Sequence, residues 1–221
     1  MNSLGSDMEK KRYVDNFEIV KKFMHFTENS DEFYFVQVLY RKKDNTEIAE
    51  NSVVLSDKSN ATRSIKSYCI TSVDLLTRLE FEIKQLCKTF NARAYFYPAK
   101  RSFKQVALKN LSELSESIAA ENYSHVKSKY WSACGKVSIE KFYLVDIDEN
   151  HYNDVDLSEI EKTIEYELKS GAEQGQRILL KVPTKHGIHF ICRPFDVKSF
   201  SEKWSDISIQ KSNPTVLFCI L

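Results

Sequence analysis

The stretch that decides the fold is KFYLVDID, residues 141–148, an apolar run that ends on two aspartates one residue apart. Side chains alternate between the two faces of a strand, so Asp146 and Asp148 share one face. Two like charges held that close repel each other unless something positive or solvent lies between them. A divalent cation is one explanation. A solvated strand end that leads into the polar loop ENHYND is the other, and both stay open.

The segments after this run predict a recognisable order of elements. They are a helix at 157–168, strands at 177–183 and 187–195, a helix at 197–204, and closing strands at 207–210 and 215–221. Only Thr184, Lys185 and His186 separate the two middle strands, which predicts a hairpin. Strand, helix, strand, strand, helix, strand is the order of a split βαβ unit, the ferredoxin-like or RRM-like arrangement.

This order has a geometric consequence for the two aspartates. With right-handed crossovers, the second hairpin strand lies between the other two and runs antiparallel to 141–148. The end of 141–148 then adjoins the beginning of 187–195. Asp146 and Asp148 are therefore expected to lie beside His189 on one face of the sheet, so that two distant stretches form one site.

The preceding residues predict an α/β portion. Strands are expected at 32–45, 63–70 and 92–98, the last closed by Pro98, and helices from 72 to 91, from 102 onward, and before Cys134. Residues 45–61 indicate a hairpin and loop. We therefore predict an α+β fold with a polar arm or short helix at 1–30 and one domain at 31–221. Within that domain, 31–140 is an N-terminal α/β subdomain and 141–221 is a ferredoxin-like subdomain.

Composition excludes several classes of protein. The 221 residues are 42% hydrophobic and carry a net charge of +1, so a core is available but no chain-wide basic field exists. Any nucleic-acid site must be a local patch. Five cysteines without a CxxC pair favour the reduced cytoplasm over a zinc site or a disulfide framework. No signal-peptide core and no run of ~20 apolar residues is present, so no membrane partner is expected.

Two short motifs carry a resemblance to a known family. VDID at a strand end, followed by PTKHGIH (183–189) at a later strand, resembles the first two motifs of the archaeo-eukaryotic primase superfamily. NARAYFYPAKRSFKQVALKNL (91–111) and WSACGK (131–136) are similar to its phage and mobile-element members. The resemblance covers roughly residues 90–221. It implies a primase-polymerase, a metal-dependent nucleotidyltransferase that acts on nucleic acid with NTP or dNTP in DNA replication.

The same resemblance implies roles for the motif residues. Asp146 and Asp148 would hold one or two Mg²⁺ or Mn²⁺ ions and, with His189, form the catalytic set. His189 would contact the triphosphate, and Thr184 and Lys185 would assist from the turn. The implied partners are a nucleoside triphosphate and a single-stranded or template nucleic acid, and a helicase stays open as a further partner.

Basic residues outside the motifs suggest further contacts with phosphate. Arg193 falls on the same strand face as His189, which favours a phosphate contact or, equally, a salt bridge. Arg93 shares a strand face with two tyrosines, and Arg101 and Lys104 follow. Basic and aromatic residues interleaved in this way suit a template strand, although the tyrosines alternatively cover a sheet surface. Lys136 is a weaker candidate for a phosphate contact.

One departure from the family pattern leaves the function open. The family has a third acidic residue on the closing strand, whereas TVLFCIL (215–221) offers none. The segment ISIQ has Gln210 where a carboxylate could stand, and Asp206 lies at the beginning of that segment. Either Asp206 reaches the site or a second metal ion is poorly held. The alternatives are a catalytically decayed module that binds a nucleotide or a single strand, and a nuclease or phosphoesterase. His186 disfavours the last, because it faces away from His189 on an extended strand.

Overall fold

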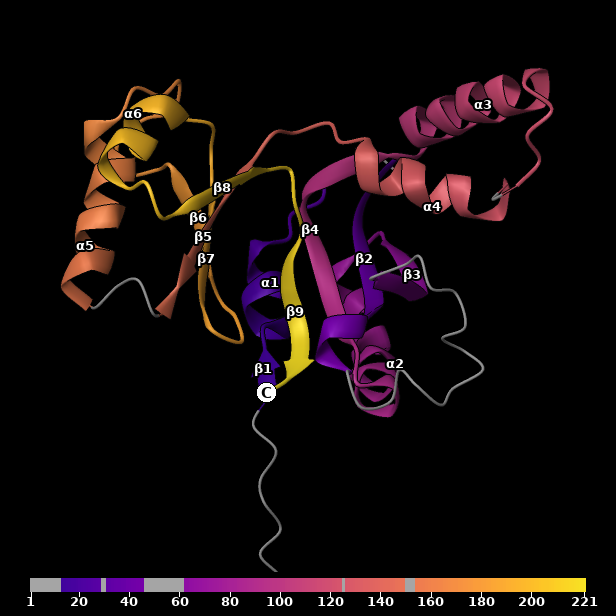
Figure 1. The fold of residues 1–221 in the computed structure, drawn as a ribbon, viewed down its shortest axis with the longest axis horizontal. Coiled ribbons are helices and arrows are strands. Elements are labelled where there is room, and N and C mark those ends of the chain that lie inside the picture. Colours follow the sequence, from indigo (N-terminus) through magenta and orange to yellow (C-terminus); the bar gives the residue numbers. More distant parts are fainter. Residues whose placement is uncertain (1–12, 29–30, 46–61, 125, 150–153) are drawn as a thin grey trace, which may run out of the picture.

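The computed structural model describes residues 13–28, 31–45, 62–124, 126–149 and 154–221. These residues form six α-helices and two antiparallel sheets, which confirms the predicted α+β class (Figure 1). Residues 1–12 of the predicted arm and residues 46–61 of the predicted hairpin and loop lie outside the described residues. Within the described part of the chain, no helix has the length and apolar character needed to cross a membrane.

The first sheet has the strand order β1-β9-β4-β2-β3. Its strands are β1 (Tyr13–Asp15), β2 (Glu32–Arg41), β3 (Thr62–Ile70), β4 (Arg93–Ser102) and β9 (Thr215–Ile220). The helices α1 (Phe17–Phe23) and α2 (Val73–Phe90) pack on one face, where Val20 and Ile83 are fully buried. The hairpin of α3 (Phe103–Ala119) and α4 (Val126–Lys136) covers part of the other face through Val106 and Ala133.

Serine side chains begin two of these helices where the sequence predicts them. The Ser72 hydroxyl accepts a hydrogen bond from the Leu75 amide (3.0 Å), and the Ser102 hydroxyl accepts one from the Gln105 amide (3.1 Å). Each bond satisfies an amide that the first turn of a helix leaves without a backbone partner. Asn91 ends α2 in the left-handed conformation (φ 43°), a usual helix stop.

The sequence predicts that the strand after α2 ends at Pro98. In the structure β4 continues to Ser102, so this predicted end is wrong. The register with β2 shifts between Phe33 and Phe35, so that residues 98–100 of β4 lie opposite the single residue Tyr34. The pairing of β4 with β9 stops at Phe96. Proline lacks an amide proton and is tolerated where the hydrogen-bonded ladder is already interrupted, so the strand passes through it.

The second sheet has the order β6-β7-β5-β8. Its strands are β5 (Tyr143–Asp148), β6 (Ile178–Pro183), β7 (Gly187–Cys192) and β8 (Ser208–Lys211). β7 lies between β5 and β6 and is antiparallel to both, as the crossover argument predicts. α5 (Asp154–Lys162), a π-helical turn (Thr163–Glu167) and α6 (Val197–Lys203) cover the face that carries Val145, Ile147 and Phe190.

The closing segments of the chain divide between the two sheets, which corrects the assignment of all of 141–221 to one subdomain. β8 pairs with β5, whereas β9 pairs with β4 and β1 in the first sheet. Ser212, at φ 57°, and the following Asn213 and Pro214 form the turn between them. Residues 215–219 are all buried, so β9 needs neighbours on both edges and cover on both faces. The position between β1 and β4 in the first sheet provides these neighbours.

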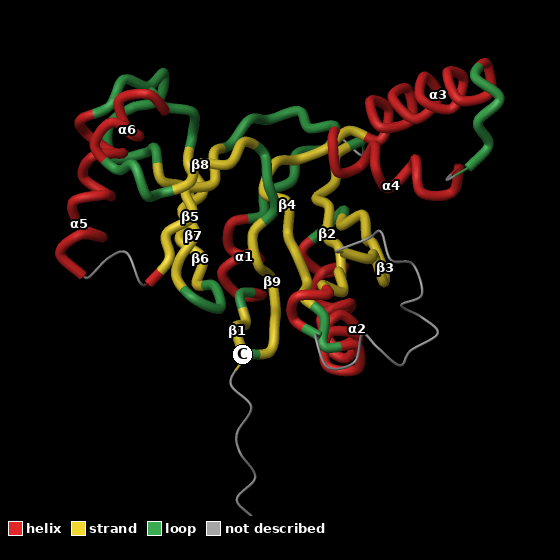
Figure 2. The backbone as a smooth tube through the Cα atoms, in the orientation of Figure 1, coloured by secondary structure: helices red, strands yellow, loops and turns green. Residues whose placement is uncertain are grey.

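Phe17, Val20 and Met24 belong to the core of the first sheet, so the folded domain begins before residue 31. α1 agrees with the short-helix alternative for this part of the predicted arm. α1 contacts β9 of the first sheet and β6 of the second, and so lies where the two sheets meet (Figure 2). The buried Asn16 amide donates to the carbonyl oxygens of Val216 and Pro183, each at 2.9 Å. One side chain therefore joins a strand of each sheet.

Candidate functional site

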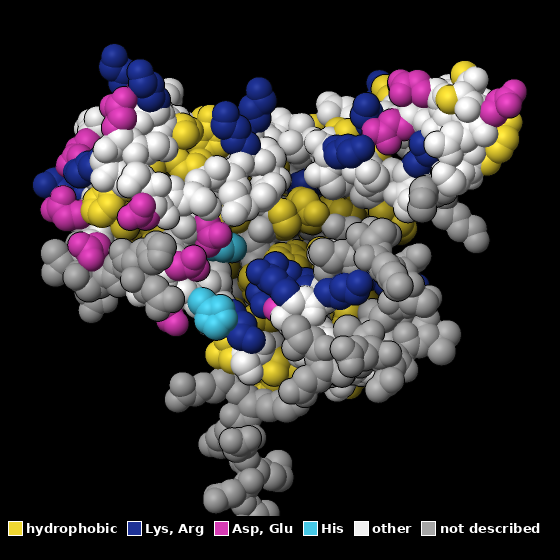
Figure 3. Space-filling view, in the orientation of Figure 1, with side chains coloured by type: hydrophobic (Ala, Val, Ile, Leu, Met, Phe, Trp, Pro, Cys, Tyr) yellow, Lys and Arg dark blue, Asp and Glu magenta, His cyan; other side chains and the backbone are white. Residues whose placement is uncertain are grey.

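A cleft of about 1010 Å³ lies between the two sheets. Its two walls differ in charge. On the face shown in Figure 3, acidic and histidine side chains lie on one side of the hollow, and Lys and Arg side chains lie on the other. The acid wall is built by β5 and the β6–β7 hairpin, and the basic wall by the end of β2, the short turn after it, and β4.

Asp146 and His189 meet on the acid wall. They are paired in the register of β5 and β7, and His189 Nε2 lies 3.0 Å from Asp146 Oδ1. On its other side, His189 Nδ1 lies 3.0 Å from the Thr215 hydroxyl of β9. A neutral ring that donates from Nε2 accepts at Nδ1, whereas an imidazolium donates from both nitrogens. The imidazole is therefore fixed at both ends, between the two sheets.

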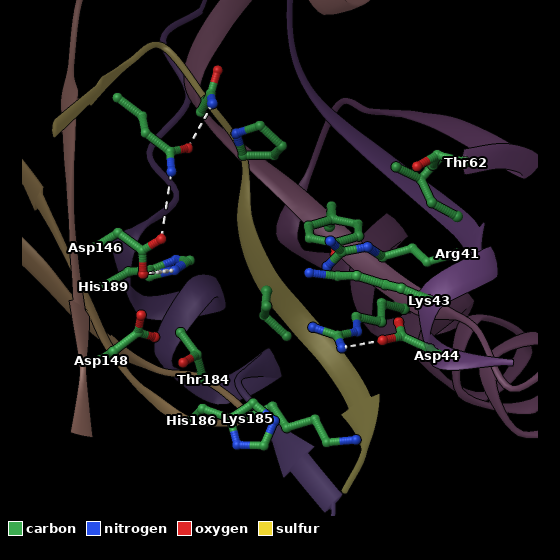
Figure 4. Close-up of a pocket in the computed structure, with 17 residues that line it drawn as sticks. Arg41, Lys43, Asp44, Thr62, Asp146, Asp148, Thr184, Lys185, His186 and His189 are labelled. Atoms are coloured by element: carbon green, nitrogen blue, oxygen red, sulfur yellow. Dashed lines mark hydrogen bonds and ion pairs between the residues drawn. The ribbon is translucent and has the colours of Figure 1, made fainter. Parts of the chain in front are cut away.

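Asp148 lies at the open end of β5, next to the hairpin turn. It pairs in register with Gly187, and its exposed side chain lines the cleft with that of Asp146 (Figure 4). A Cβ atom on Gly187 would overlap the carbonyl oxygen of Ile147 and lie 2.9 Å from the Asp148 Cα atom. Glycine at this position thus lets β7 approach the strand that carries both aspartates.

Gln210 approaches the remaining oxygen of Asp146. Its amide nitrogen lies 3.4 Å from Asp146 Oδ2, and its oxygen accepts a hydrogen bond from Asn213 at 2.6 Å. Asp206, the other candidate from the sequence, is exposed and does not line the cleft. Among the described residues, no group of three or more His, Cys, Asp or Glu side chains is arranged to hold a metal ion.

The donor set nevertheless fits one kind of metal site. Mg²⁺ commonly takes one or two protein carboxylates and completes its shell with water and substrate phosphates. Asp146 and Asp148 supply two carboxylates on one face of β5, and both line the cleft. The acid wall therefore suits a cation whose shell is completed by a phosphate ligand, and does not suit a cage made by protein alone.

Sequence analysis did not predict the two cations of the basic wall, Arg41 and Lys43. Arg41 at the end of β2 and Lys43 in the turn that follows extend toward the acid wall (Figure 4). Arg41 Nη1 donates to the Tyr95 hydroxyl at 3.0 Å, which holds its guanidinium at the cleft. The run Arg41-Lys42-Lys43 directly after an apolar strand was the available signal. Its meaning depends on which element lies opposite, and that is a tertiary relation.

Several predicted residues line the cleft. Thr184 and Lys185 do so from the hairpin turn, together with His189. His186 lines the cleft as well, so the expectation that it faces away from His189 is wrong, because it lies in the turn before β7 and not on the extended strand. Arg93 also lines it, but its guanidinium is paired with Asp44 Oδ1 at 2.6 Å. This ion pair is largely buried, which makes the Arg93 side chain part of the wall's framework.

Other predicted residues are not brought to the cleft. Arg193 lies beyond the far end of β7 and lines a separate pocket with Phe142. Arg101 is 1% exposed, and its Nε donates to the Cys134 carbonyl oxygen at 2.9 Å, so a nucleic-acid strand has no access to it. Burial lowers the pKa of Arg101 to about 10. Lys104 is exposed at the beginning of α3, outside the cleft lining.

Charge reversal on the basic wall is expected to weaken binding of a polyphosphate ligand. Arg41→Glu and Lys43→Glu each replace an attractive contact with a repulsive one, so each is expected to raise the Kd for a nucleoside triphosphate by at least about tenfold. Calorimetric titration measures the Kd. The matched control is Lys198→Glu, because that side chain is 88% exposed on α6, away from the cleft. Equal weakening by the control would contradict a local contact.

Comparisons with models of protein families, with curated proteins and with solved structures found no match. The resemblance of residues 90–221 to the primase superfamily therefore stays a prediction. The functional interpretation of this chain rests on the geometry of the cleft.

Proposed function

We propose that the protein is a metal-dependent nucleotidyltransferase of primase-polymerase type and that the cleft binds a nucleoside triphosphate. The observation that carries this proposal is the opposition of two walls. Asp146, Asp148 and His189 lie together on one wall, and Arg41 and Lys43 extend from the other. A polyphosphate with its cation matches both walls, because phosphate oxygens pair with Arg and Lys while the cation pairs with carboxylates.

The second sheet supports the family resemblance. Its chain order of strand, helix, strand, strand, helix, strand and its arrangement β6-β7-β5-β8 are compatible with a ferredoxin-like unit. That type of fold hosts many activities, so the fold by itself does not select one. The side chains of the cleft favour phosphate chemistry.

In this proposal each residue has a defined task. Asp146 and Asp148 hold the Mg²⁺ or Mn²⁺ ions, which supply activation of a 3′-hydroxyl and neutralisation of the leaving pyrophosphate. Thr184 and Lys185 donate to the triphosphate from the hairpin turn. Because both His189 nitrogens already have partners, His189 contacts phosphate by transferring its Nε2 proton donation from Asp146 to a phosphate oxygen.

A specific observation favours a second candidate, a binding module of the same fold without turnover. Gln210 lies on β8 beside Asp146, where a third carboxylate of the family pattern would be able to reach the site, and its amide supplies no charge for a second cation. In this candidate the cleft binds a nucleotide, or a single strand of nucleic acid, but does not transfer a nucleotidyl group.

The test separates the two candidates and the hydrolase alternative. The wild-type chain is incubated with Mn²⁺ or Mg²⁺, a labelled primed template and either NTP or dNTP, and nucleotide binding is measured in parallel by calorimetry. Extension of the primer supports the transferase. Binding without extension supports the module. Shortening of the labelled strand without added nucleotide supports a nuclease, and absence of any nucleotide binding contradicts the first two.

A further inference from the structure

A second groove, of about 440 Å³, adjoins the cleft beneath α4. Asn213 and Pro214, in the turn between β8 and β9, line both the cleft and the groove, so the two are continuous across that turn. The far end of the groove is formed by α4, which contributes Trp131, Ser132 and Lys136. The floor comes from the first sheet.

Trp131 presents an aromatic surface to this groove. Its ring lies parallel to that of Phe35, with 6.1 Å between the centroids and 14° between the planes. Tyr130 contacts it edge-on with centroids 5.2 Å apart. These contacts fix the orientation of the indole, yet 38% of Trp131 remains exposed. A large ring held by aromatic neighbours and open on its outer side is a stacking surface for a planar group.

The polar groups around this ring suit phosphate. The Lys136 side chain is 61% exposed, and its Nζ lies 3.3 Å from Glu113 Oε1. Glu113 itself does not line the groove. Ser132 and Ser64 add hydroxyl groups to the lining. Among the described residues, no aspartate or glutamate lines the groove. Stacking on an aromatic ring combined with cationic and hydroxyl contacts is how proteins bind single strands without reading their sequence.

We propose that this groove binds single-stranded nucleic acid, with one base stacked on Trp131 and a neighbouring phosphate bound by Lys136. The strand then crosses Asn213 and Pro214 and enters the cleft next to the acid wall. This assignment rests on the proposed function, which requires a strand in the cleft. Asn213 also donates to Gln210, the neighbour of Asp146, so a strand that crosses the turn contacts a hydrogen-bonded chain leading to the acid wall.

The test uses fluorescence anisotropy to measure the binding of labelled oligo(dT) and oligo(U), each about 12 nucleotides long, and of a duplex of the same length. Neither a nucleoside triphosphate nor a metal ion is added. Trp131→Ala is expected to weaken single-strand binding about tenfold, because stacking of one base contributes about 1–3 kcal/mol. Trp131→Phe is expected to retain most of the affinity. Comparing oligo(dT) with oligo(U) shows whether DNA or RNA is preferred.

Lys136 has a matched control in the same ion-pair cluster. Lys136→Ala is expected to weaken binding and to reduce the slope of log K against log salt by about one. Lys109 also pairs with Glu113, at 3.5 Å, but does not line the groove, so Lys109→Ala is expected to bind like the wild type. Equal losses in both variants would overturn the assignment of Lys136.

A second measurement does not depend on truncating Trp131. Trp204, the other tryptophan, lies on the opposite face of the second sheet, so in a Trp204→Phe background the indole emission reports Trp131 alone. Saturation with the oligonucleotide is expected to quench this emission. Unchanged emission together with unchanged affinity of Trp131→Ala would overturn the proposal, as would equal quenching by the duplex or by an acidic peptide.

Failure of the groove assignment and failure of the proposed function give different results in these experiments. A wild type that binds the oligonucleotide through Trp131 but binds no nucleotide overturns the proposed function and supports the groove assignment. A wild type that extends primers while Trp131→Ala binds the oligonucleotide unchanged overturns the groove assignment alone.

Discussion

Replacing Asp146 and Asp148 together by asparagine is expected to reduce Mn²⁺-dependent nucleotide binding by on the order of 100-fold, about 2.7 kcal/mol. Asparagine keeps the size of each side chain and its capacity to accept hydrogen bonds, but it removes the two negative charges that a hard cation requires. The repulsion between the carboxylates disappears as well. The free energy of unfolding is therefore expected to change by less than about 0.5 kcal/mol. Calorimetry and denaturant unfolding measure the two quantities.

The control for this double variant is Asp206→Asn. Asp206 is an exposed carboxylate near the beginning of β8 that does not line the cleft, so its neutralisation is expected to leave nucleotide binding unchanged. A loss comparable with that of the double variant would make Asp206 a ligand and contradict its position outside the cleft. Full binding by the double variant would favour the solvated strand end over the metal site.

Gly187→Ala is expected to destabilise the protein by about 3 kcal/mol. The new methyl group would overlap the Ile147 carbonyl oxygen and crowd the Asp148 backbone, and both obstacles are main-chain atoms of the paired strand. Main chain cannot rotate away as a flexible side chain does, so β5 and β7 would have to separate. Denaturant unfolding measures the loss, and nucleotide binding by the fraction that remains folded is expected to fall with it.

Gly171→Ala is the matched control, because a Cβ atom there meets nothing within 4 Å and no positive φ is involved. Its effect on the free energy of unfolding is expected to stay below about 0.5 kcal/mol. A similar cost at both positions would show that loss of backbone freedom, and not contact with β5, explains the result.

Local patterns were sufficient to predict the acid wall. Alternation along 141–148 places Asp146 and Asp148 on one face, and the order of elements places β7 beside β5. These two facts predict that the aspartates lie beside His189 on one face, and the structure adds the register that pairs Asp146 with His189. The beginnings of α2 near Ser72 and of α3 near Ser102 were predicted for the same reason, since each helix start depends on residues that are close in the sequence.

The features that sequence analysis missed depend on long-range packing. An apolar strand such as 215–220 satisfies either sheet, and only the open position between β1 and β4 decides where it pairs. Arginine usually lies on the surface, yet Arg101 is buried beneath the α3–α4 hairpin and bonds to it. Arg41 and Lys43 become a binding wall only because the second sheet lies opposite them.

The chain passes from the second sheet to the first between β8 and β9, and this passage links the positions of the two walls of the cleft. Ser212, Asn213 and Pro214 connect β8, which pairs with β5 of the acid wall, to β9 in the first sheet, and the His189–Thr215 contact lies just beyond them. Wider opening of the cleft would therefore have to extend this three-residue connection or break the His189–Thr215 contact. A fragment that ended at residue 140 would lack β9, the strand between β1 and β4. The first sheet is therefore complete only when the C-terminal segment is present.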